Sequence, residues 1–299
     1  MSNLVINPEF PVGNAAGWCK SVSEVKALAQ STASFIVVGS ITLKQRDGNP
    51  GNVFNGDLYG GLNSLGLPNP GIERIREIGP EMCQIAHKAG KPIIMSVAGL
   101  TPYEFETLTR AAHKIGFDGV ELNMGCGNIA DEEERKPVIS FRRKLVCASL
   151  EAASLGLSMT NADWFVSVKV SPMDPDRLKE IASVIPLFPV NTIVTMNTEV
   201  NCIDFRPDGR PVIDTPDKTG YAGGSGESVF HKALGQVHQW RACLPRLIDV
   251  WGVGGVQSGE QVRKMQWAGA SAVQVGTAYF VCGTKIFGDI ANQFINKED

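Results

Sequence analysis

Apolar runs rich in β-branched residues recur along the chain, and each is followed by a longer amphipathic segment. Short apolar runs are typical of buried strands, whereas apolar residues spaced three and four apart are typical of helices. The pattern predicts eight strands, at residues 12–16, 35–40, 92–97, 118–123, 164–170, 191–197, 247–252 and 272–276. It predicts helices at residues 22–31, 71–89, 102–115, 138–155, 176–185, 228–243, 259–268 and 285–295.

Regular alternation of strands and helices predicts an α/β protein with a parallel sheet. Eight such units in 299 residues favour a (β/α)8 TIM barrel over an open doubly wound sheet, which usually has fewer strands. No Ser-rich or Gly-rich linker and no block of charge divides the chain. We therefore expect residues 1–299 to form a single barrel domain.

Three connections are longer than a minimal strand-to-helix loop requires, at residues 41–70, 124–137 and 198–227. They follow the second, fourth and sixth predicted strands and are rich in Gly, Pro, Asn and Asp. Long ordered loops on this fold usually form the binding site. The sequence therefore predicts a site built from these insertions.

Composition and charge exclude several classes of protein. The chain is 43% hydrophobic and 20% charged, which is typical of a globular protein. Its 28 Lys and Arg and 31 Asp and Glu give a net charge of −3, so there is no basic field for nucleic acid. No apolar stretch is long enough for a membrane span, and the N-terminus lacks the pattern of a signal peptide. We expect a soluble, cytoplasmic protein without a nucleic acid or membrane partner.

The cysteines and histidines do not indicate a metal site. The seven cysteines are scattered without CxxC spacing, which favours free thiols over disulfides or zinc ligands. The four histidines lie in predicted helices and form no HxxxH or HExxH pair. We expect no metal.

Polar side chains close several of the predicted strands. They are Asn123, Cys126 and Asn128 after the fourth, Lys169 in the fifth, and Asn197 and Thr198 after the sixth, with Asn63 in the first long insertion. Barrel enzymes have their reactive groups at the carboxyl ends of the strands. Several carboxamides and one lysine would form a pocket suited to a planar heterocycle with amide-like edges. A single loop Asn is as often a turn residue, but the coincidence at several strand ends favours a site.

Cys126 differs from the other cysteines because it lies between two glycines, where no bulky neighbour covers it. It is the best candidate for a reactive thiol, whereas a small buried hydrophobe is the better interpretation of the other six. The DEEER segment at residues 131–135 is either a solvated loop or a lid.

Glycine clusters follow the last two predicted strands. GVGGVQSG occupies residues 252–259, and Gly276 and Thr277 precede the last helix. TIM barrels often bind a phosphate with these two loops through glycine amides. GYAGGSGES at residues 220–228 offers further amides, although tight turns explain any one cluster equally well. A dinucleotide-binding Rossmann motif is excluded because the third spaced glycine is missing.

Nearly the whole chain resembles the class 1 dihydroorotate dehydrogenases, FMN-containing barrel enzymes of pyrimidine biosynthesis. NAAGWCK at residues 14–20 and TLKQRDGNP at residues 42–50 are similar to the motifs of the family's first two strands. LNSLGLPN at residues 62–69 resembles its substrate loop, and ELNMGCGN resembles the loop of the catalytic cysteine. The soluble, homodimeric branch that uses fumarate as electron acceptor is the most similar.

The resemblance implies roles for individual residues. Cys126 would be the base that takes a proton from dihydroorotate while a hydride passes to FMN, and Lys169 would contact the flavin. The substrate-binding residues would be Asn63, Leu65, Gly66, Leu67, Asn123, Asn128, Asn197 and Thr198, with the amides of the three residues after Ser64 facing the carboxylate. The FMN-binding residues would be Ala15, Ala16, Gly17, Ser40, Asn123, Lys169, Gly224, Gly254, Gly255, Gly276 and Thr277.

Three features depart from the family's pattern. Gly39 aligns with a lysine that contacts orotate and flavin, so one charge that would face the carboxylate is missing. Gly125 and Gly127 replace Ser and Pro beside the cysteine, which predicts a looser loop. Phe230 and His231 replace a Lys-Pro pair. These departures leave two alternatives: a flavoenzyme for another dihydropyrimidine or an unsaturated carbonyl compound, and a catalytically silent flavin-binding paralogue.

Overall fold

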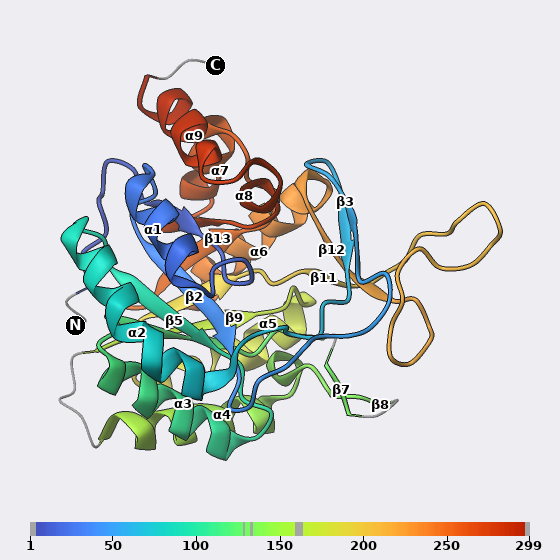
Figure 1. Cartoon of the computed structure of the whole chain (residues 1–299), viewed down its shortest axis with the longest axis horizontal. Coiled ribbons are helices and arrows are strands. Elements are labelled where there is room, and N and C mark those ends of the chain that lie inside the picture. The colour runs from blue at the N-terminus through green and yellow to red at the C-terminus, as the bar shows by residue number, and fades with distance from the viewer. Residues whose placement is uncertain (1–3, 128, 132–133, 159–163, 297–299) are drawn as a thin grey trace.

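Eight parallel strands follow one another around a barrel in their order along the chain, in a computed structural model that describes residues 4–127, 129–131, 134–158 and 164–296 (Figure 1). They are β1 (Val12–Asn14), β2 (Ile36–Ile41), β5 (Ile93–Val97), β6 (Gly119–Asn123), β9 (Phe165–Val170), β10 (Thr192–Thr195), β13 (Asp249–Val253) and β14 (Ala272–Val275). Each overlaps one predicted strand. The predicted (β/α)8 barrel is therefore confirmed.

Helices cover the outside of the barrel (Figure 1). They are α1 (Val22–Gln30), α2 (Gly71–Lys88), α3 (Pro102–Ile115), α4 (Arg143–Ser158), α5 (Pro175–Ala182), α6 (Phe230–Cys243), α7 (Gly259–Trp267), α8 (Thr277–Cys282) and α9 (Lys285–Asn296), with 3-10 turns η1 (Ile139–Phe141), η2 (Ile185–Leu187) and η3 (Glu227–Val229). Helix starts coincide with side-chain caps. Ser21, Thr101 and Ser258 each accept a hydrogen bond from the backbone N–H three residues on.

The predicted start of the fourth helix at residue 138 is wrong. Residues 139–141 form the turn η1, and α4 begins only at Arg143. Ser140 explains the difference, because its N–H donates to the carbonyl of Met124 (2.9 Å) and its Oγ accepts from the N–H of Ser171 (3.2 Å). These bonds tie the segment to the ends of β6 and β9 instead of to a helical turn.

One side chain closes the ring of strands between β1 and β2. The Asn14 Oδ1 accepts from the N–H of Val37 (2.9 Å), and its Nδ2 donates to the carbonyl of the same residue (2.7 Å). The carboxamide thus replaces a backbone partner in the sheet. Beyond it, the N–H of Gly39 donates to the carbonyl of Cys19 (2.7 Å), which continues the seam toward the carboxyl end.

The strands are buried on both faces. Residues of β2, β5, β6, β9 and β10 are all buried, which explains why apolar residues occur on both faces of these strands. Inside the amino-terminal half, the rings of Phe35, Phe165 and Trp251 pack at centroid distances of 4.9 and 5.3 Å. The barrel therefore has a filled floor, and open space remains only toward the carboxyl end.

The long insertions form a small antiparallel sheet at that end. β3 (Phe54–Gly56) and β4 (Gly61–Asn63) come from the first, and β11 (Glu199–Cys202) and β12 (Ala222–Ser225) come from the third. In Figure 1 this sheet lies on the right of the barrel. β7 (Ala130–Asp131) and β8 (Glu134–Arg135) pair within the second insertion. Segments far apart in the sequence therefore meet at one mouth.

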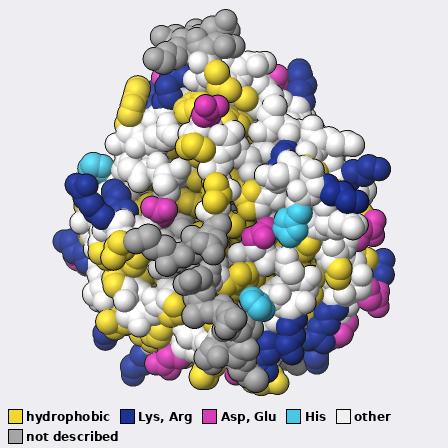
Figure 2. Space-filling model, turned by 90° about the vertical axis from the view of Figure 1, so that its left-hand side faces the viewer, with side chains coloured by type: hydrophobic (Ala, Val, Ile, Leu, Met, Phe, Trp, Pro, Cys, Tyr) yellow, Lys and Arg dark blue, Asp and Glu magenta, His cyan; other side chains and the backbone are white. Residues whose placement is uncertain are grey.

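The opposite end of the molecule carries charges of both signs. Figure 2 shows basic side chains mostly near the edge of this face, with acidic side chains and histidines between them. The Nε2 of His87 lies 3.0 Å from the carboxylate of Asp118, and this carboxylate also accepts from the N–H of Ile93 (2.8 Å). The Asp118 carboxylate thus holds the start of β5, which is a structural role.

Replacement of Asn14 by Leu tests the seam. The variant keeps the volume of the side chain but leaves the N–H and C=O of Val37 without their partners, and each unpaired buried group costs roughly 1–3 kcal/mol. We expect the free energy of unfolding to fall by about 2–4 kcal/mol in urea denaturation. Asn7→Leu, at an exposed position, is the control and should change it little. An Asn14→Leu variant as stable as the wild type would contradict this account.

Candidate active site

A deep cleft opens at the carboxyl ends of the strands, where the small sheet approaches the barrel. It encloses about 1220 Å³, with its open mouth included. The predicted site residues that line it are Ala15, Ala16, Gly17, Ser40, Asn63, Leu65, Gly66, Leu67, Asn123, Cys126, Lys169, Asn197, Thr198, Gly224, Gly254, Gly255, Gly276 and Thr277. Asn128, also predicted, lies outside the described residues. The structure thus brings together residues from both ends of the chain.

A network of hydrogen bonds fixes the carboxamide of Asn123, which is only 7% exposed. Its Nδ2 donates to the Oγ of Ser40 (2.9 Å), which lies 2.9 Å from the Oγ of Ser96. Its Oδ1 accepts from the Nδ2 of Asn197 (3.1 Å) and the N–H of Gly125 (3.2 Å). Four barrel strands thereby determine which way one amide points, and a ligand meets preset donors and acceptors.

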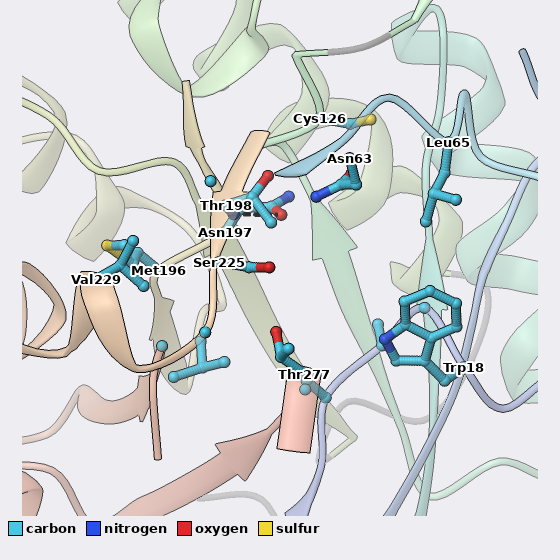
Figure 3. Close-up of a pocket in the computed structure, with 18 of the residues that line it drawn as sticks. Trp18, Asn63, Leu65, Cys126, Met196, Asn197, Thr198, Ser225, Val229 and Thr277 are labelled. Carbon is cyan, nitrogen blue, oxygen red and sulfur yellow. Dashed lines mark hydrogen bonds between the residues drawn. The ribbon is translucent and has the colours of Figure 1, made fainter. Parts of the chain in front are cut away.

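Further polar groups face the same space. Figure 3 shows the side chains of Asn63, Asn197 and Thr198 pointing toward one another, with Cys126 nearby. The Asn63 Nδ2 donates to the carbonyl of Gly223 (3.1 Å), and the Asn197 Oδ1 accepts from the N–H of Thr198 (2.8 Å). The carboxamides are thus held by backbone groups of the third insertion.

Lys169 lies on the floor of the cleft and is balanced by a buried carboxylate. Its Nζ donates to the Oε1 of Gln274 (3.0 Å), and the Nε2 of Gln274 donates to the Oε2 of Glu121 (2.7 Å). The Lys169 Nζ and Glu121 Oε1 are 3.9 Å apart, with side chains 5% and 1% exposed. Burial lowers the pKa of Lys169, and the carboxylate of Glu121 opposes this effect.

Cys126 lies half-buried in the loop after β6. The sequence predicts a loose loop here, but a Cβ on Gly125 would stand 2.8 Å from the Cβ of Asn197 and from the N of Ser171. In addition, the Ser171 Oγ donates to the carbonyl of Gly125 (2.7 Å). Position 125 is a glycine because the backbone passes too close to its neighbours for a side chain, and the looseness of the loop stays a prediction.

Glycines line the far end of the cleft, where helix α6 packs behind them. Gly254 and Gly255 have φ values of +126° and +74°, which other residues rarely adopt. A Cβ on Gly255 would lie 2.8 Å from the Cβ of Phe230, which fills the space behind the loop. Bare backbone therefore faces the cavity, together with the hydroxyl groups of Ser225 and Thr277 (Figure 3).

Comparison with known proteins shows the family. The model of the family described as dihydroorotate dehydrogenase matches residues 4–297. The chain belongs to the dihydroorotate dehydrogenase family. It is therefore a flavin-dependent oxidoreductase of pyrimidine biosynthesis that acts on a CH–CH bond.

Relatives agree with the family match. Proteins of Streptococcus pyogenes serotype M1 and Streptococcus uberis, both named dihydroorotate dehydrogenase A (fumarate), are 29% and 30% identical to the chain. Each alignment covers 94% of this chain and 86% of the relative. A dihydroorotate dehydrogenase of Eimeria tenella, solved in complex with ferulenol, superposes with a TM-score of 0.79 at 18% identity, over 99% of this chain and 86% of that one. The latter likeness establishes the fold.

In the part of the chain that the structure describes, this member of the dihydroorotate dehydrogenase family has neither a candidate membrane span nor a candidate metal site. No helix there has the length and apolar character needed to cross a membrane. Nor do His, Cys, Asp and Glu side chains in those residues gather in groups of three or more that could hold a metal ion.

Gly39, the first departure from the family pattern, cannot carry a side chain in this backbone. Its φ is +119°, and a Cβ would stand 2.3 Å from the carbonyl oxygen of Ser96 and 2.9 Å from the N of Ile41. The local backbone path therefore excludes every residue except glycine, which explains why this position has no lysine.

Several cleft residues have no individual role predicted from the sequence, although many of them lie in segments that the sequence motifs single out. They are Trp18, Lys20, Phe54, Leu58, Pro68, Met196, Ser225, Gly226, Glu227, Val229, Val253, Val256, Gln257 and Ala278. The ring of Trp18 stacks on the ring of Phe280 with their centroids 4.0 Å apart. It also packs edge to face with the ring of Phe54, at a centroid distance of 6.0 Å. Trp18 and Lys20 directly follow the first strand and could have been found by that position, whereas Phe54 depends on how the insertion folds back.

Glu121→Gln tests the charge balance on the cleft floor. Breaking a buried ion pair typically costs about 3 kcal/mol or more, so we expect a loss of about that size in the free energy of unfolding at pH 7. Because burial lowers the pKa of Lys169, the unfolded chain binds more protons between the folded and unfolded pKa values, and stability rises with pH there. Without Glu121 the pKa of folded Lys169 falls further, so the pH range in which stability rises begins at lower pH. The loss of stability in the variant relative to the wild type therefore becomes smaller as the pH rises.

Urea denaturation at pH 7 and pH 10 measures this difference. Glu81→Gln, an exposed carboxylate on α2, is the control. Equal losses for Glu121→Gln at both pH values would show that the carboxylate acts through packing and not through the charge of Lys169.

Proposed function

We propose that the protein oxidises dihydroorotate to orotate with FMN as cofactor, with Cys126 as the base. The observation that carries this proposal is the convergence of Cys126, Asn63, Asn123 and Asn197 on one cleft with Lys169 at its floor. The residues reach it from the barrel strands β6 and β9, the loops after β6 and β10, and the small sheet. A thiol beside a ring of carboxamides suits proton removal from an uncharged planar ring.

The cleft fits FMN in three respects. Its glycine wall at Gly254, Gly255 and Gly276 admits a phosphate close to backbone N–H groups, and the Thr277 hydroxyl adds a donor. Ala15, Ala16, Gly17 and Gly224 leave room for a wide ring system. Ser40, Asn123 and Lys169 present polar groups at the floor. When bound, FMN supplies the acceptor for the hydride that leaves C6 of the substrate.

The pyrimidine ring is bound by amide groups. The carboxamides of Asn63, Asn123 and Asn197 offer both donors and acceptors to its ring N–H and carbonyl groups, and the hydroxyl of Thr198 adds another polar group. The backbone amides at residues 65–67 face the carboxylate. Because the Asn123 side chain is held by three hydrogen-bonding neighbours, little rotational freedom is lost when the ring binds.

Cys126 takes the proton from C5 as the C6 hydride departs. The thiolate is the basic form, and its proton remains on the sulfur until solvent removes it. Lys169 holds a positive charge at the floor, which stabilises negative charge that develops in the cleft during the reaction. Glu121 and Gln274 keep the Lys169 ammonium in place.

The names of the relatives support a proposal for the electron acceptor. The streptococcal relatives carry fumarate in their names, which supports fumarate as the acceptor of this protein. We further propose a cytoplasmic homodimer in which residues 1–299 form one FMN-binding domain.

A second candidate is oxidation of a dihydropyrimidine without a carboxylate. It is favoured by Gly39, where the backbone leaves no room for a cationic side chain. Anaerobic mixing separates the two candidates. We expect dihydroorotate to bleach the flavin absorbance band and dihydrouracil to leave it unchanged. Bleaching by dihydrouracil alone would establish the second candidate, and a purified protein that neither contains nor binds FMN would contradict both.

Cys126→Ala tests the base. General-base catalysis contributes roughly 10²- to 10⁴-fold, so we expect the rate of anaerobic flavin reduction to fall by about that factor. In the wild type the rate should rise with pH, because cysteine thiols ordinarily deprotonate near pH 8.5, and this rise should disappear in the variant. Cys282→Ala, remote from the cleft lining, is the control. Unchanged reduction in Cys126→Ala would show that Cys126 is not the base, and the absence of reduction in both proteins would indicate a catalytically silent paralogue.

A further inference from the structure

Few charged side chains line the cleft in the part of the chain that the structure describes. They are Lys20, Lys169 and Glu227. Lys169 is already balanced by Glu121 and bound to Gln274. A substrate that brings a carboxylate into this space therefore needs a cation that is not already neutralised, because burying an unpaired charge is costly.

Lys20 is placed beside the substrate loop. It follows β1 and contributes to the cleft lining together with Leu65, Gly66 and Leu67. Its Nζ donates to the carbonyl of Pro68 (2.6 Å), the residue directly after these three. An ammonium group has three N–H donors, so this bond positions the charge at the loop and leaves further donors for a ligand.

The carboxylate of Glu24 attracts the charge of Lys20, and it also accepts several hydrogen bonds at the start of α1. The Oε2 of Glu24 accepts from the N–H groups of Lys20 (2.7 Å) and Ser21 (2.8 Å) and from the Ser21 Oγ (2.8 Å). These bonds form the cap of α1. The Glu24 carboxylate is thus directed at the backbone at the start of the helix.

The pairing between the segment after β1 and strand β2 explains why the positive charge comes from Lys20. Cys19, directly before Lys20, pairs with Gly39 across the seam. Position 39 admits no side chain, since a Cβ there would meet the carbonyl of Ser96 at 2.3 Å. Of the two backbones that meet at this point, only the one that carries Lys20 can place a cation at the cleft.

We propose that Lys20 binds the carboxylate of the substrate and so determines specificity for carboxylated pyrimidines. This inference rests on the proposed function, because it assigns the carboxylate of the same substrate. It makes Lys20 a binding residue and assigns it no proton transfer.

The test measures binding of orotate and of uracil, which lacks the carboxylate, to the purified holoprotein by isothermal titration calorimetry. Lys20→Met keeps the length of the side chain without its charge, and Lys20→Arg keeps a charge that can still reach the carbonyl of Pro68. Loss of a charged hydrogen bond predicts that Lys20→Met weakens orotate binding roughly 10- to 100-fold and leaves uracil binding unchanged. Lys20→Arg should recover most of the loss. Lys26→Met, exposed on α1, is the matched control.

The outcomes separate the two proposals. If Lys20→Met weakens both ligands equally, Lys20 only supports the substrate loop and the inference is overturned; it is also overturned if the wild type binds no orotate. If orotate binding depends on Lys20 but dihydroorotate does not bleach the flavin, the inference stands and the proposed oxidation of dihydroorotate is wrong.

Discussion

The hydrogen bonds that join β1 to β2 hold the ring of strands closed, and the geometry of the cleft depends on this closure. Asn14 makes the join with a side chain because its carboxamide offers one donor and one acceptor in the arrangement of a peptide group. Ser40 and Gly39 lie just beyond the join on β2, and Ala15 to Gly17 directly follow β1. A shift of one strand against the other would therefore move both walls of the cleft.

The cleft combines a neutral middle with charges at defined places. Carboxamides and hydroxyl groups surround the central space, which suits the binding of a ring by hydrogen bonds without the cost of burying several like charges. The Lys169 charge at the floor is balanced by Glu121 through direct attraction and through Gln274. In our proposal Lys20 provides the charge at the rim, where the ligand's own carboxylate completes the balance.

Two departures from the family pattern have the same physical origin. Gly39 and Gly125 both occupy points where one backbone passes within van der Waals distance of another, so that a Cβ would collide with Ser96 or with Asn197. Phe230, a third departure, packs behind Gly255 and shapes the glycine wall from outside. These residues change how the cleft is built while Cys126 and Lys169, together with the described Asn residues, remain in its lining.

The order of apolar runs and amphipathic segments was enough to predict a barrel, because a fully buried parallel strand and the helix that covers it each leave a recognisable pattern. Polar residues at strand ends predicted much of the cleft, since all strand ends of a barrel share one mouth. The partners of those residues were not predictable. That Lys20 reaches Pro68, that Glu121 balances Lys169, and that Gly39 excludes a side chain depend on distances between segments far apart in the chain. Such distances are determined by tertiary packing, and local sequence carries no record of them.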